Sequence, residues 1–339
     1  MSVGAPWSVQ VELVEGCNRL CPFCGLNAIR KGPGNYKWMA WETAERTSRS
    51  LVDLCPTARL EFAMHGEPTM HPRKHEILAM FRERLPKAQM QLTTNGNVLA
   101  GKMQERLEAI FDAGVDFVLM DTYYPERLML QAKAQALQGI QVLDFYRDCQ
   151  PNGWSPYHNH HRSVQRTLVV MDDLGLRNGE SRSRIVVNQA GNSPAVPETR
   201  APLRRMCTLP FREVTVAWNG DVNLCCEDWG HEYTCGNVLE DSLRAIWWGE
   251  AFEAARRVLF ARRRAMTPCC RCDKASGPRV GLVPKYDPPN KADLETIRVT
   301  QAASRPTNGR KAWFDPLLDG VLGTPDVGGP MAKGGQAWS

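Results

Sequence analysis

The chain has 339 residues, of which 43% are hydrophobic, and a formal net charge of +5. That length is enough for one large domain or two smaller ones. No run of 18 apolar residues is present and the N-terminus has no secretory signal pattern, which argues against a membrane span and for a cytoplasmic protein. Twelve cysteines in a reducing compartment favour metal binding over disulfides.

Short apolar runs alternate with amphipathic segments over the first two hundred residues. This pattern predicts strands at residues 8–14, 58–64, 90–96, 115–121, 140–146, 166–172 and 184–188. It predicts helices at residues 41–55, 74–85, 102–114 and 125–139. Repeated strand–helix units favour a parallel α/β sheet or barrel, whose functional loops follow the carboxyl ends of the strands.

The pattern changes near residue 200. Residues 213–226 predict a β-hairpin, because they contain an Asn-Gly turn between two apolar runs. Residues 242–265 predict an arginine-rich helix, and a Pro-Cys-Cys-Arg-Cys segment follows it. Residues 276–339 are rich in proline, glycine and polar residues, which predicts an extended or partly disordered, irregular tail.

Three cysteines, Cys17, Cys21 and Cys24, follow the first predicted strand. Thiolates are the usual ligands of iron–sulfur clusters. A four-iron cluster held by three thiolates keeps one iron open to a substrate or cofactor, whereas a structural zinc site normally needs four ligands. A remote residue such as His65 could supply the fourth ligand, so the cysteine count alone leaves zinc as an alternative.

The Cys-x3-Cys-x2-Cys spacing, with Phe23 before the last cysteine, resembles the signature of radical S-adenosylmethionine (SAM) enzymes. The resemblance implies an α/β fold with a partial (β/α)6 TIM-like barrel over residues 1–200. It also implies a [4Fe-4S] cluster on Cys17, Cys21 and Cys24, whose open iron chelates the methionyl group of SAM. An electron from a donor such as flavodoxin or ferredoxin would then cleave SAM to a 5′-deoxyadenosyl radical.

The segment His-Gly-Glu-Pro at residues 65–68 follows the second of the predicted barrel strands. It resembles the Gly-Gly-Glu-Pro motif that contacts the methionyl amino group in this family. His65 replaces the first glycine, while Gly66, Glu67 and Pro68 stay in register. The physical reason is an acidic or carbonyl acceptor for an ammonium group on backbone that passes close by. A turn with a solvated glutamate is the alternative.

Three further polar residues end predicted strands and suit contacts to SAM, namely Asn95, Asp121 and Asn188. Asn95, in a Thr-Thr-Asn-Gly segment, is expected to bond the ribose or the carboxylate. Asp121 and Asn188 are expected near the ribose or adenine. Ordinary polar turns at strand ends explain all three equally well.

A second set of cysteines consists of Cys207, Cys225, Cys269 and Cys272. The pattern Cys-x12-Gly-x4-Cys, followed by Cys-x2-Cys, resembles the C-terminal SPASM or twitch extension of radical SAM enzymes. The longer cysteine run of full SPASM domains is missing, so the resemblance implies one auxiliary [4Fe-4S] cluster in a domain over residues 201–275. A zinc ribbon is the alternative.

Neighbouring residues leave parts of this second site open. Cys226 and Cys270 adjoin predicted ligands, and Cys235 is a further candidate. No catalytic residue is assigned. Glu227 and Asp228 are candidate bases only because they lie beside the second cysteine set.

These features predict an enzyme that abstracts hydrogen from an unactivated C–H bond. The substrate would be a peptide, an amino acid or a small molecule, and the net reaction an oxidation or a rearrangement. Five arginines within residues 256–264 keep a nucleotide or nucleic-acid base as an alternative substrate. A zinc-stabilised nucleic-acid-binding protein is the alternative of another class, but it leaves the three-cysteine loop and the Gly-Glu-Pro segment unexplained.

Overall fold

The computed structural model of the chain describes residues 3–29, 35–122, 127–152, 165–171, 188–195, 206–261, 266–274, 286–307 and 310. Its parallel strands are β1 (Ser8–Val11), β4 (Arg59–Phe62), β5 (Gln89–Thr94), β6 (Phe117–Asp121), β7 (Gln141–Asp144) and β8 (Thr167–Met171). The helices that alternate with them are α1 (Trp41–Leu54), α2 (Lys74–Arg84), α3 (Met103–Asp112) and α4 (Arg127–Gln135). These elements confirm the predicted strand–helix pattern, except that residues 184–187 of the last predicted strand lie outside the described residues.

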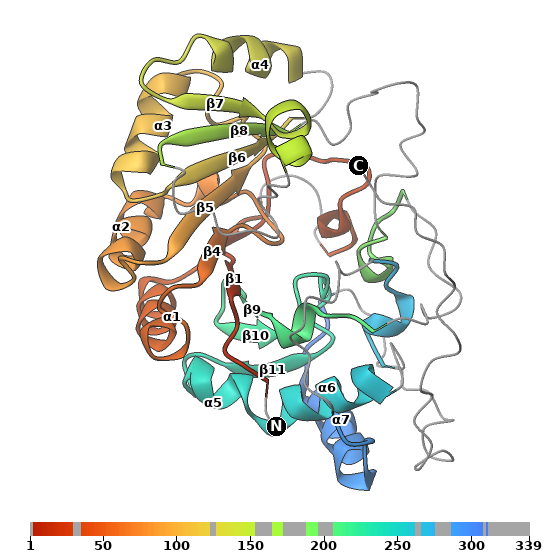
Figure 1. Cartoon of the computed structure of the whole chain (residues 1–339). Coiled ribbons are helices and arrows are strands. Elements are labelled where there is room, and N and C mark those ends of the chain that lie inside the picture. Colours follow the sequence, from red (N-terminus) through yellow and green to blue (C-terminus); the bar gives the residue numbers. More distant parts are fainter. Residues whose placement is uncertain are drawn as a thin grey trace.

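The C-terminal part adds three strands, β9 (Glu213–Val216), β10 (Asp221–Asn223) and β11 (Thr234–Asn237). They continue the same sheet, whose order is β11-β10-β9-β1-β4-β5-β6-β8-β7 (Figure 1). β9 pairs in parallel with β1, and β10 folds back on β9 as the predicted antiparallel hairpin. A separate two-stranded sheet joins β2 (Val14–Glu15) to β3 (Lys37–Trp38). The fold is therefore mixed α/β with a mostly parallel sheet.

Alternate residues of β4 face opposite sides of the sheet. Phe62 packs edge-on against Phe81 of α2, with the ring centroids 5.2 Å apart. Arg59 and Glu61 are buried on the other side, where Arg59 Nη1 donates to Gln91 Oε1 of β5 at 2.8 Å. α1, α2 and α3 lie along the outer face of the sheet in Figure 1. The helix-covered face is thus apolar and the opposite face is polar.

The region predicted as one helix over residues 242–265 contains two, α5 (Leu243–Trp247) and α6 (Glu250–Ala261). The helix is interrupted around Gly249, where a Cβ atom would lie 2.8 Å from the carbonyl oxygen of Ala245. None of the helices in the described chain is both long and apolar enough to cross a membrane.

The tail prediction was wrong for residues 291–303, which form helix α7 (Lys291–Ala303). A capping box starts this helix, because Asn290 accepts from the backbone of Asp293 while Asp293 accepts from the backbone of Asn290. The helix packs on α6, and Arg257 Nε donates to Asp293 Oδ1 at 2.9 Å. It buries only two large apolar side chains, Leu294 and Ile297, which explains its weak sequence signal.

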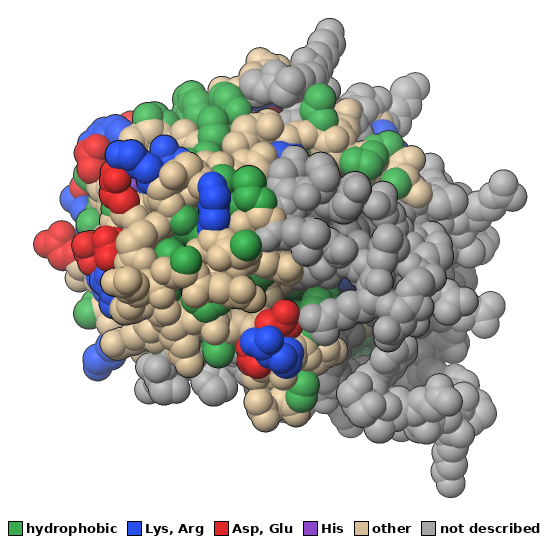
Figure 2. All heavy atoms as spheres, turned by 90° about the horizontal axis from the view of Figure 1, so that it is seen from above, with side chains coloured by type: hydrophobic (Ala, Val, Ile, Leu, Met, Phe, Trp, Pro, Cys, Tyr) green, Lys and Arg blue, Asp and Glu red, His purple; other side chains and the backbone are tan. Residues whose placement is uncertain are grey.

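The arginine-rich segment does not present a simple basic face in its described part. Arg256 of α6 is fully buried, and its guanidinium stacks over Trp247 at 4.1 Å. Its Nε and Nη1 atoms donate to the carbonyl oxygens of Pro210 and Trp247 at 2.8 and 2.7 Å. Figure 2 shows the face on the opposite side from α6, where acidic and basic side chains lie next to one another, mainly along one edge. A solvated or nucleic-acid-binding role was therefore the wrong expectation for Arg256.

Arg256→Met is expected to destabilise the protein by about 3 kcal/mol or more, because two buried carbonyl groups lose charged donors. Urea unfolding followed by circular dichroism measures the effect. Arg49→Met is the matched control, since Arg49 is a solvent-exposed partner of Glu45 within α1, and it should change stability by less than about 0.5 kcal/mol. Equal midpoints for the two variants would contradict a structural role for Arg256.

Candidate functional site

The first cysteine set lies on the loop that follows β1 and β2. The side chains of Cys17, Cys21 and Cys24 are partly exposed. The loop turns tightly, because the amide N–H of Cys24 donates to the carbonyl oxygen of Cys21 at 3.0 Å. Asn27 Nδ2 donates to the same oxygen at 2.6 Å. Cys21 and Cys24 therefore lie on one short, hydrogen-bonded turn, and Cys17 precedes it on the same loop.

The Gly-Glu-Pro segment contacts this loop through its backbone. Gly16 and Gly66 form a parallel bridge, and the amide N–H of Glu67 donates to the carbonyl oxygen of Gly16 at 2.9 Å. A Cβ atom on Gly66 would lie only 1.9 Å from the carbonyl oxygen of Val14. Glycine is required at residue 66 because two backbone segments pass within contact distance. Pro68 follows directly and is buried.

The Glu67 carboxylate accepts hydrogen bonds from neighbouring residues of the protein. Its Oε1 accepts from the Thr69 amide at 3.2 Å and from the Thr94 hydroxyl at 2.6 Å, and its Oε2 accepts from the Asn95 amide at 2.8 Å. The side chain is buried, and desolvation raises the pKa of Glu67. A solvated glutamate is thus excluded. Glu67 fixes the end of β5 against the Gly-Glu-Pro turn, which leaves the backbone of that turn as the available ligand surface.

Asn95 lies beside the first cysteine set. Its Nδ2 donates to Asn18 Oδ1 at 2.9 Å and lies 3.4 Å from Cys17 Sγ. Asp121 ends β6 on the same edge of the parallel sheet and is partly exposed. The structure therefore brings Gly66, Asn95 and the first cysteines to the carboxyl ends of the strands, as predicted for functional loops.

Asn188 lies against the second cysteine set instead. Its Nδ2 donates to the carbonyl oxygen of Arg271 at 2.6 Å, and its Oδ1 accepts from the Asp273 amide at 3.2 Å. The side chain is fully buried. Asn188 thus holds the loop that carries Cys269 and Cys272, rather than presenting a polar group toward the first loop.

The residues after Asn188 contact the first cysteine loop. Ser193 Oγ donates to the carbonyl oxygen of Phe23 at 2.7 Å, and the side-chain oxygen of Gln189 accepts from the Gly25 amide. Gln189 and Ala190 have φ angles of 51° and 53°, in the left-handed region that few non-glycine residues adopt. Residues 188–193 therefore form a bridge between the two cysteine loops.

The second cysteine set is gathered in the interior. Cys207 and Cys225 pack in one apolar cluster with Leu209. Burial raises the pKa of the Cys225 thiol well above its ordinary value, and the nearby thiols of Cys226, Cys269, Cys207 and Cys272 raise it further. The four predicted ligands are thus neighbours, although the chain brings them from three separate segments.

The alternative thiols face other groups. Burial raises the pKa of Cys226, and the adjacent carboxylate of Glu213 raises it further. Cys235 lies near Arg256, and burial is again the main cause of its raised pKa. Neither environment is dominated by other thiols, in contrast to that of Cys225.

The two candidate bases are engaged in structural contacts. Glu227 forms an ion pair with Lys274. Asp228 is fully buried and accepts from the backbone amides of Glu232 and Tyr233 at 2.8 Å each. Asp228 thus caps the turn before β11.

The spacing of the thiols can be compared with what a zinc ion requires. Four thiolates around one zinc ion lie about 3.8 Å from one another, given a Zn–S distance of about 2.3 Å. Among the described residues, a single group of three or more ligating side chains has its ligand atoms within 4.8 Å of one another, and it contains no cysteine. No three cysteine thiols of the described residues therefore lie within 4.8 Å of one another, as the ligands of one zinc ion would.

That compact group consists of Glu12, His65 and His231, all of them buried. Desolvation raises the pKa of Glu12 to about 8 and lowers the pKa of His65 to about 3. The sequence suggested His65 as a departure from a glycine and as a possible fourth ligand of the first cysteine set, and it gave no signal for Glu12 or His231. Glu12 follows β1 and His231 precedes β11, so no local spacing links them.

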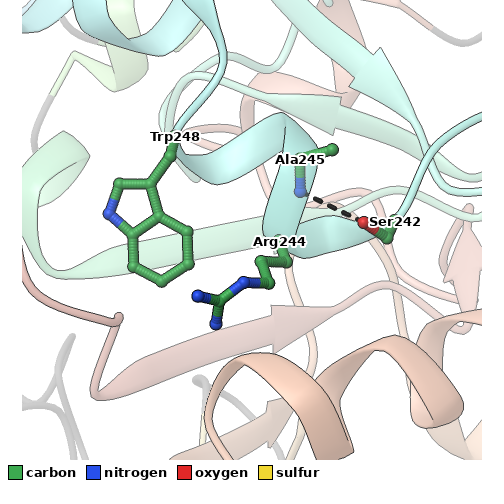
Figure 3. Close-up of a pocket in the computed structure, with 4 residues that line it drawn as sticks. All are labelled: Ser242, Arg244, Ala245 and Trp248. Carbon is green, nitrogen blue, oxygen red and sulfur yellow. Dashed lines mark hydrogen bonds between the residues drawn. The ribbon is translucent and has the colours of Figure 1, made fainter.

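A surface hollow of about 670 Å³ lies beside α5 (Figure 3). Ser242 caps the helix by accepting from the Ala245 amide at 3.1 Å, and Arg244 lies over the Trp248 ring at 4.8 Å. Trp248 Nε1 donates to the carbonyl oxygen of Val3 at 2.8 Å. These contacts anchor the N-terminal segment and contribute no residue to either cysteine set.

Comparisons with known proteins match both parts of the chain. A family model described as the radical SAM superfamily matches residues 11–132, and one described as an iron–sulfur cluster-binding domain, SPASM, matches residues 207–273. A relative from Niallia circulans, named S-adenosyl-L-methionine-dependent 2-deoxy-scyllo-inosamine dehydrogenase, is 22% identical over 270 residues. The match covers 79% of this chain and 93% of the relative.

Two solved structures share the fold. BtrN in complex with AdoMet and 2-DOIA is 20% identical to this chain, with a TM-score of 0.58. The match covers 80% of this chain and 95% of the BtrN chain. BtrN in an open conformation is 17% identical, with a TM-score of 0.53, and the match covers 79% of this chain and 92% of the BtrN chain. The two matched family models contain the first cysteine set and the second set respectively.

Gly66→Ala is expected to destabilise the protein by more than about 2 kcal/mol, because the new methyl group would overlap the Val14 carbonyl oxygen. Gly101→Ala is the matched control, since a Cβ there would meet only Arg106 Nη1 at 3.8 Å. The urea midpoint of each purified variant measures the difference. An unchanged midpoint for Gly66→Ala would show that the two backbone segments can separate without cost.

Proposed function

We propose that this chain, which belongs to the radical SAM superfamily and carries a SPASM-type iron–sulfur domain, dehydrogenates a small molecule. The domains of this family bind [4Fe-4S] clusters and SAM. When bound, these groups supply one-electron chemistry and a carbon radical that abstracts hydrogen. The observation that carries the proposal is a relative named as a dehydrogenase, of which the chain matches 93%.

The first loop would hold the cluster that cleaves SAM. Cys17, Cys21 and Cys24 are three partly exposed thiols on one loop, and three thiolates would leave one coordination position of a four-iron cluster for a ligand. The backbone at Gly66 and Glu67 lies against this loop and would receive the methionyl amino group. The Asn95 side chain, 3.4 Å from Cys17 Sγ, would contact SAM from the neighbouring strand.

The second set would hold the auxiliary cluster. Dehydrogenation removes two electrons and two protons from the substrate, and one electron and one proton leave together as the abstracted hydrogen atom. The second electron needs an acceptor, and the second proton is released. Cys207, Cys225, Cys269 and Cys272 would close the coordination of a cluster with four thiolates, which suits electron acceptance. A rearrangement would need no such acceptor.

The first test of this proposal is anaerobic reconstitution with iron and sulfide, followed by dithionite and SAM. We expect about eight irons per chain from two four-iron clusters, and release of 5′-deoxyadenosine. A variant with Cys17, Cys21 and Cys24 changed to Ala should retain about four irons and release none. Zinc in place of iron, or equal 5′-deoxyadenosine from both proteins, would overturn the proposal.

A second prediction separates the auxiliary ligands from their neighbours. Cys225→Ala should lower the iron content from about eight to about four per chain, while cleavage of SAM continues. Cys226→Ala is the matched control, because its thiol lies beside Glu213, and it should keep about eight irons. Iron analysis and Mössbauer spectra measure both. Loss of iron in the Cys226 variant alone would transfer the ligand role to that residue.

2-Deoxy-scyllo-inosamine serves as the first substrate probe, because the relative is named for it. A product two mass units lighter, formed together with 5′-deoxyadenosine, supports dehydrogenation. A product of unchanged mass would instead indicate an isomerase.

A further inference from the structure

We propose that Glu12, His65 and His231 bind a zinc ion at the junction between the parallel barrel and the C-terminal domain. Glu12 follows β1, His65 follows β4, and His231 lies on the loop between β10 and β11. One carboxylate oxygen and two ring nitrogens from these residues lie within 4.8 Å of one another. Two histidines and one glutamate form a known ligand set for zinc. The proposal stands independently of the reaction proposed above.

The cluster is dry and compact. Glu12, His65 and His231 are 0%, 1% and 3% exposed. Ligand atoms around a tetrahedral zinc ion lie about 3.4 Å apart when each metal–ligand distance is about 2.0–2.2 Å. The observed group therefore needs only small side-chain movements to close around an ion.

The hydrogen bonds of His65 fix which nitrogen is available. His65 Nε2 lies 2.9 Å from the carbonyl oxygen of Cys226, so this nitrogen must carry the proton. Nδ1 then bears a lone pair, and it lies 3.5 Å from Glu12 Oε1, which is also an acceptor. No described residue donates to Nδ1. Two facing acceptors in a buried site require a cation or a proton between them.

This arrangement of His65 is the one seen around metals. Histidine ligands normally donate their other ring N–H to a backbone carbonyl or carboxylate, which orients the ring. The Cys226 carbonyl supplies that acceptor, and the Trp229 ring packs on His65 with centroids 4.4 Å apart. The ring is therefore held in place before any ion binds.

His231 offers a second nitrogen to the same space. Its Nδ1 lies 3.1 Å from the Asn223 side-chain amide, and its Nε2 is buried with no hydrogen-bond partner among the described residues. The structure places Asn223 Nδ2 at His231 Nδ1, and Asn223 Oδ1 accepts from the Thr234 hydroxyl. Metal binding through His231 Nε2 requires the amide to rotate by 180°, so that Oδ1 accepts from Nδ1–H and Nδ2 donates to the Thr234 hydroxyl, which is both donor and acceptor. His231 Nε2 is then free to bind metal. The φ angle of His231 is 53°, a left-handed value that is uncommon for a non-glycine residue.

Glu15 lies beside the cluster and lines a cavity next to it. Glu15 Oε2 is buried, lies 3.4 Å from His231 Nε2, and has no hydrogen-bond partner among the described residues. Its other oxygen pairs with Lys37. A polar cavity of about 460 Å³ is lined by Glu15, His231 and Lys37. This cavity reaches the cluster at His231, which gives an ion a route toward the site in the folded protein.

The ion would join the two parts of the molecule. Glu12 and His65 lie on the loops that follow β1 and β4. His231 follows Cys225 and Cys226 on the loop between β10 and β11. The three protein ligands leave one coordination position on the zinc ion, and the buried Glu15 Oε2, 3.4 Å from His231 Nε2, lies near it. The role of the ion would be to hold the auxiliary hairpin against the Gly-Glu-Pro turn.

The experiment uses the anaerobically reconstituted holoenzyme, incubated with zinc and then desalted in the presence of a weak chelator. Elemental analysis should give about one zinc per chain, and X-ray absorption at the zinc edge should show only nitrogen and oxygen ligands at about 2.0–2.2 Å. His231→Asn should lose most of this zinc, because asparagine tolerates the left-handed backbone but lacks the ring nitrogen. His65→Asn should do the same.

His71→Asn is the matched control. His71 is also buried, but Nε2 faces the Met39 carbonyl oxygen at 3.0 Å and Nδ1 accepts from the Arg73 amide at 3.1 Å. This variant should keep its zinc. Three results would overturn the proposal: wild type without zinc, sulfur ligands at about 2.3 Å, or retention of zinc by both variants of the cluster. The wild-type spectrum decides the matter even where a variant fails to fold.

Discussion

Pairing of β1 on both of its edges is the constraint on which the rest of the structure depends. Residues 8–11 pair in parallel with β4 on one side and with β9 on the other. Parallel strands release their following loops at the same edge of a sheet. The first cysteine loop, the Gly-Glu-Pro turn and the turn between β9 and β10 therefore leave the sheet at the same edge. A separate C-terminal domain joined by a flexible linker would not place them together.

Two glutamates in this region, Glu67 and Glu12, are both buried but differ in the number of hydrogen bonds that they accept. Desolvation raises the pKa of both Glu67 and Glu12. Glu67 is satisfied by four donors and so serves as a fixed brace between the Gly-Glu-Pro turn and Asn95. Glu12 accepts from only two described donors, the backbone amides of His65 and Trp218. The first carboxylate is thus structural, whereas the second has remaining capacity for a cation.

Sequence patterns predicted the features whose residues are close together in the chain. The spacing of Cys17, Cys21 and Cys24 is local, and strand periodicity gave most of the parallel sheet. Glu12 and His231 are more than 200 residues apart and become neighbours only through β1–β9 pairing, so no spacing identifies them. Arg256 was misread for a related reason. An arginine on a helix normally faces water, and its burial here depends on carbonyl groups from two other segments.

Residues 188–193 form hydrogen bonds to both cysteine loops and so connect them. Asn188 is bonded to the loop of Cys269 and Cys272, and Ser193 to the loop of Cys24. The left-handed backbone at Gln189 and Ala190 costs free energy, because non-glycine residues rarely adopt these φ angles. Such strain persists only where surrounding contacts over-determine it. A fixed separation between two redox centres is one requirement that would justify it, because electron transfer within a protein depends on holding its centres in place.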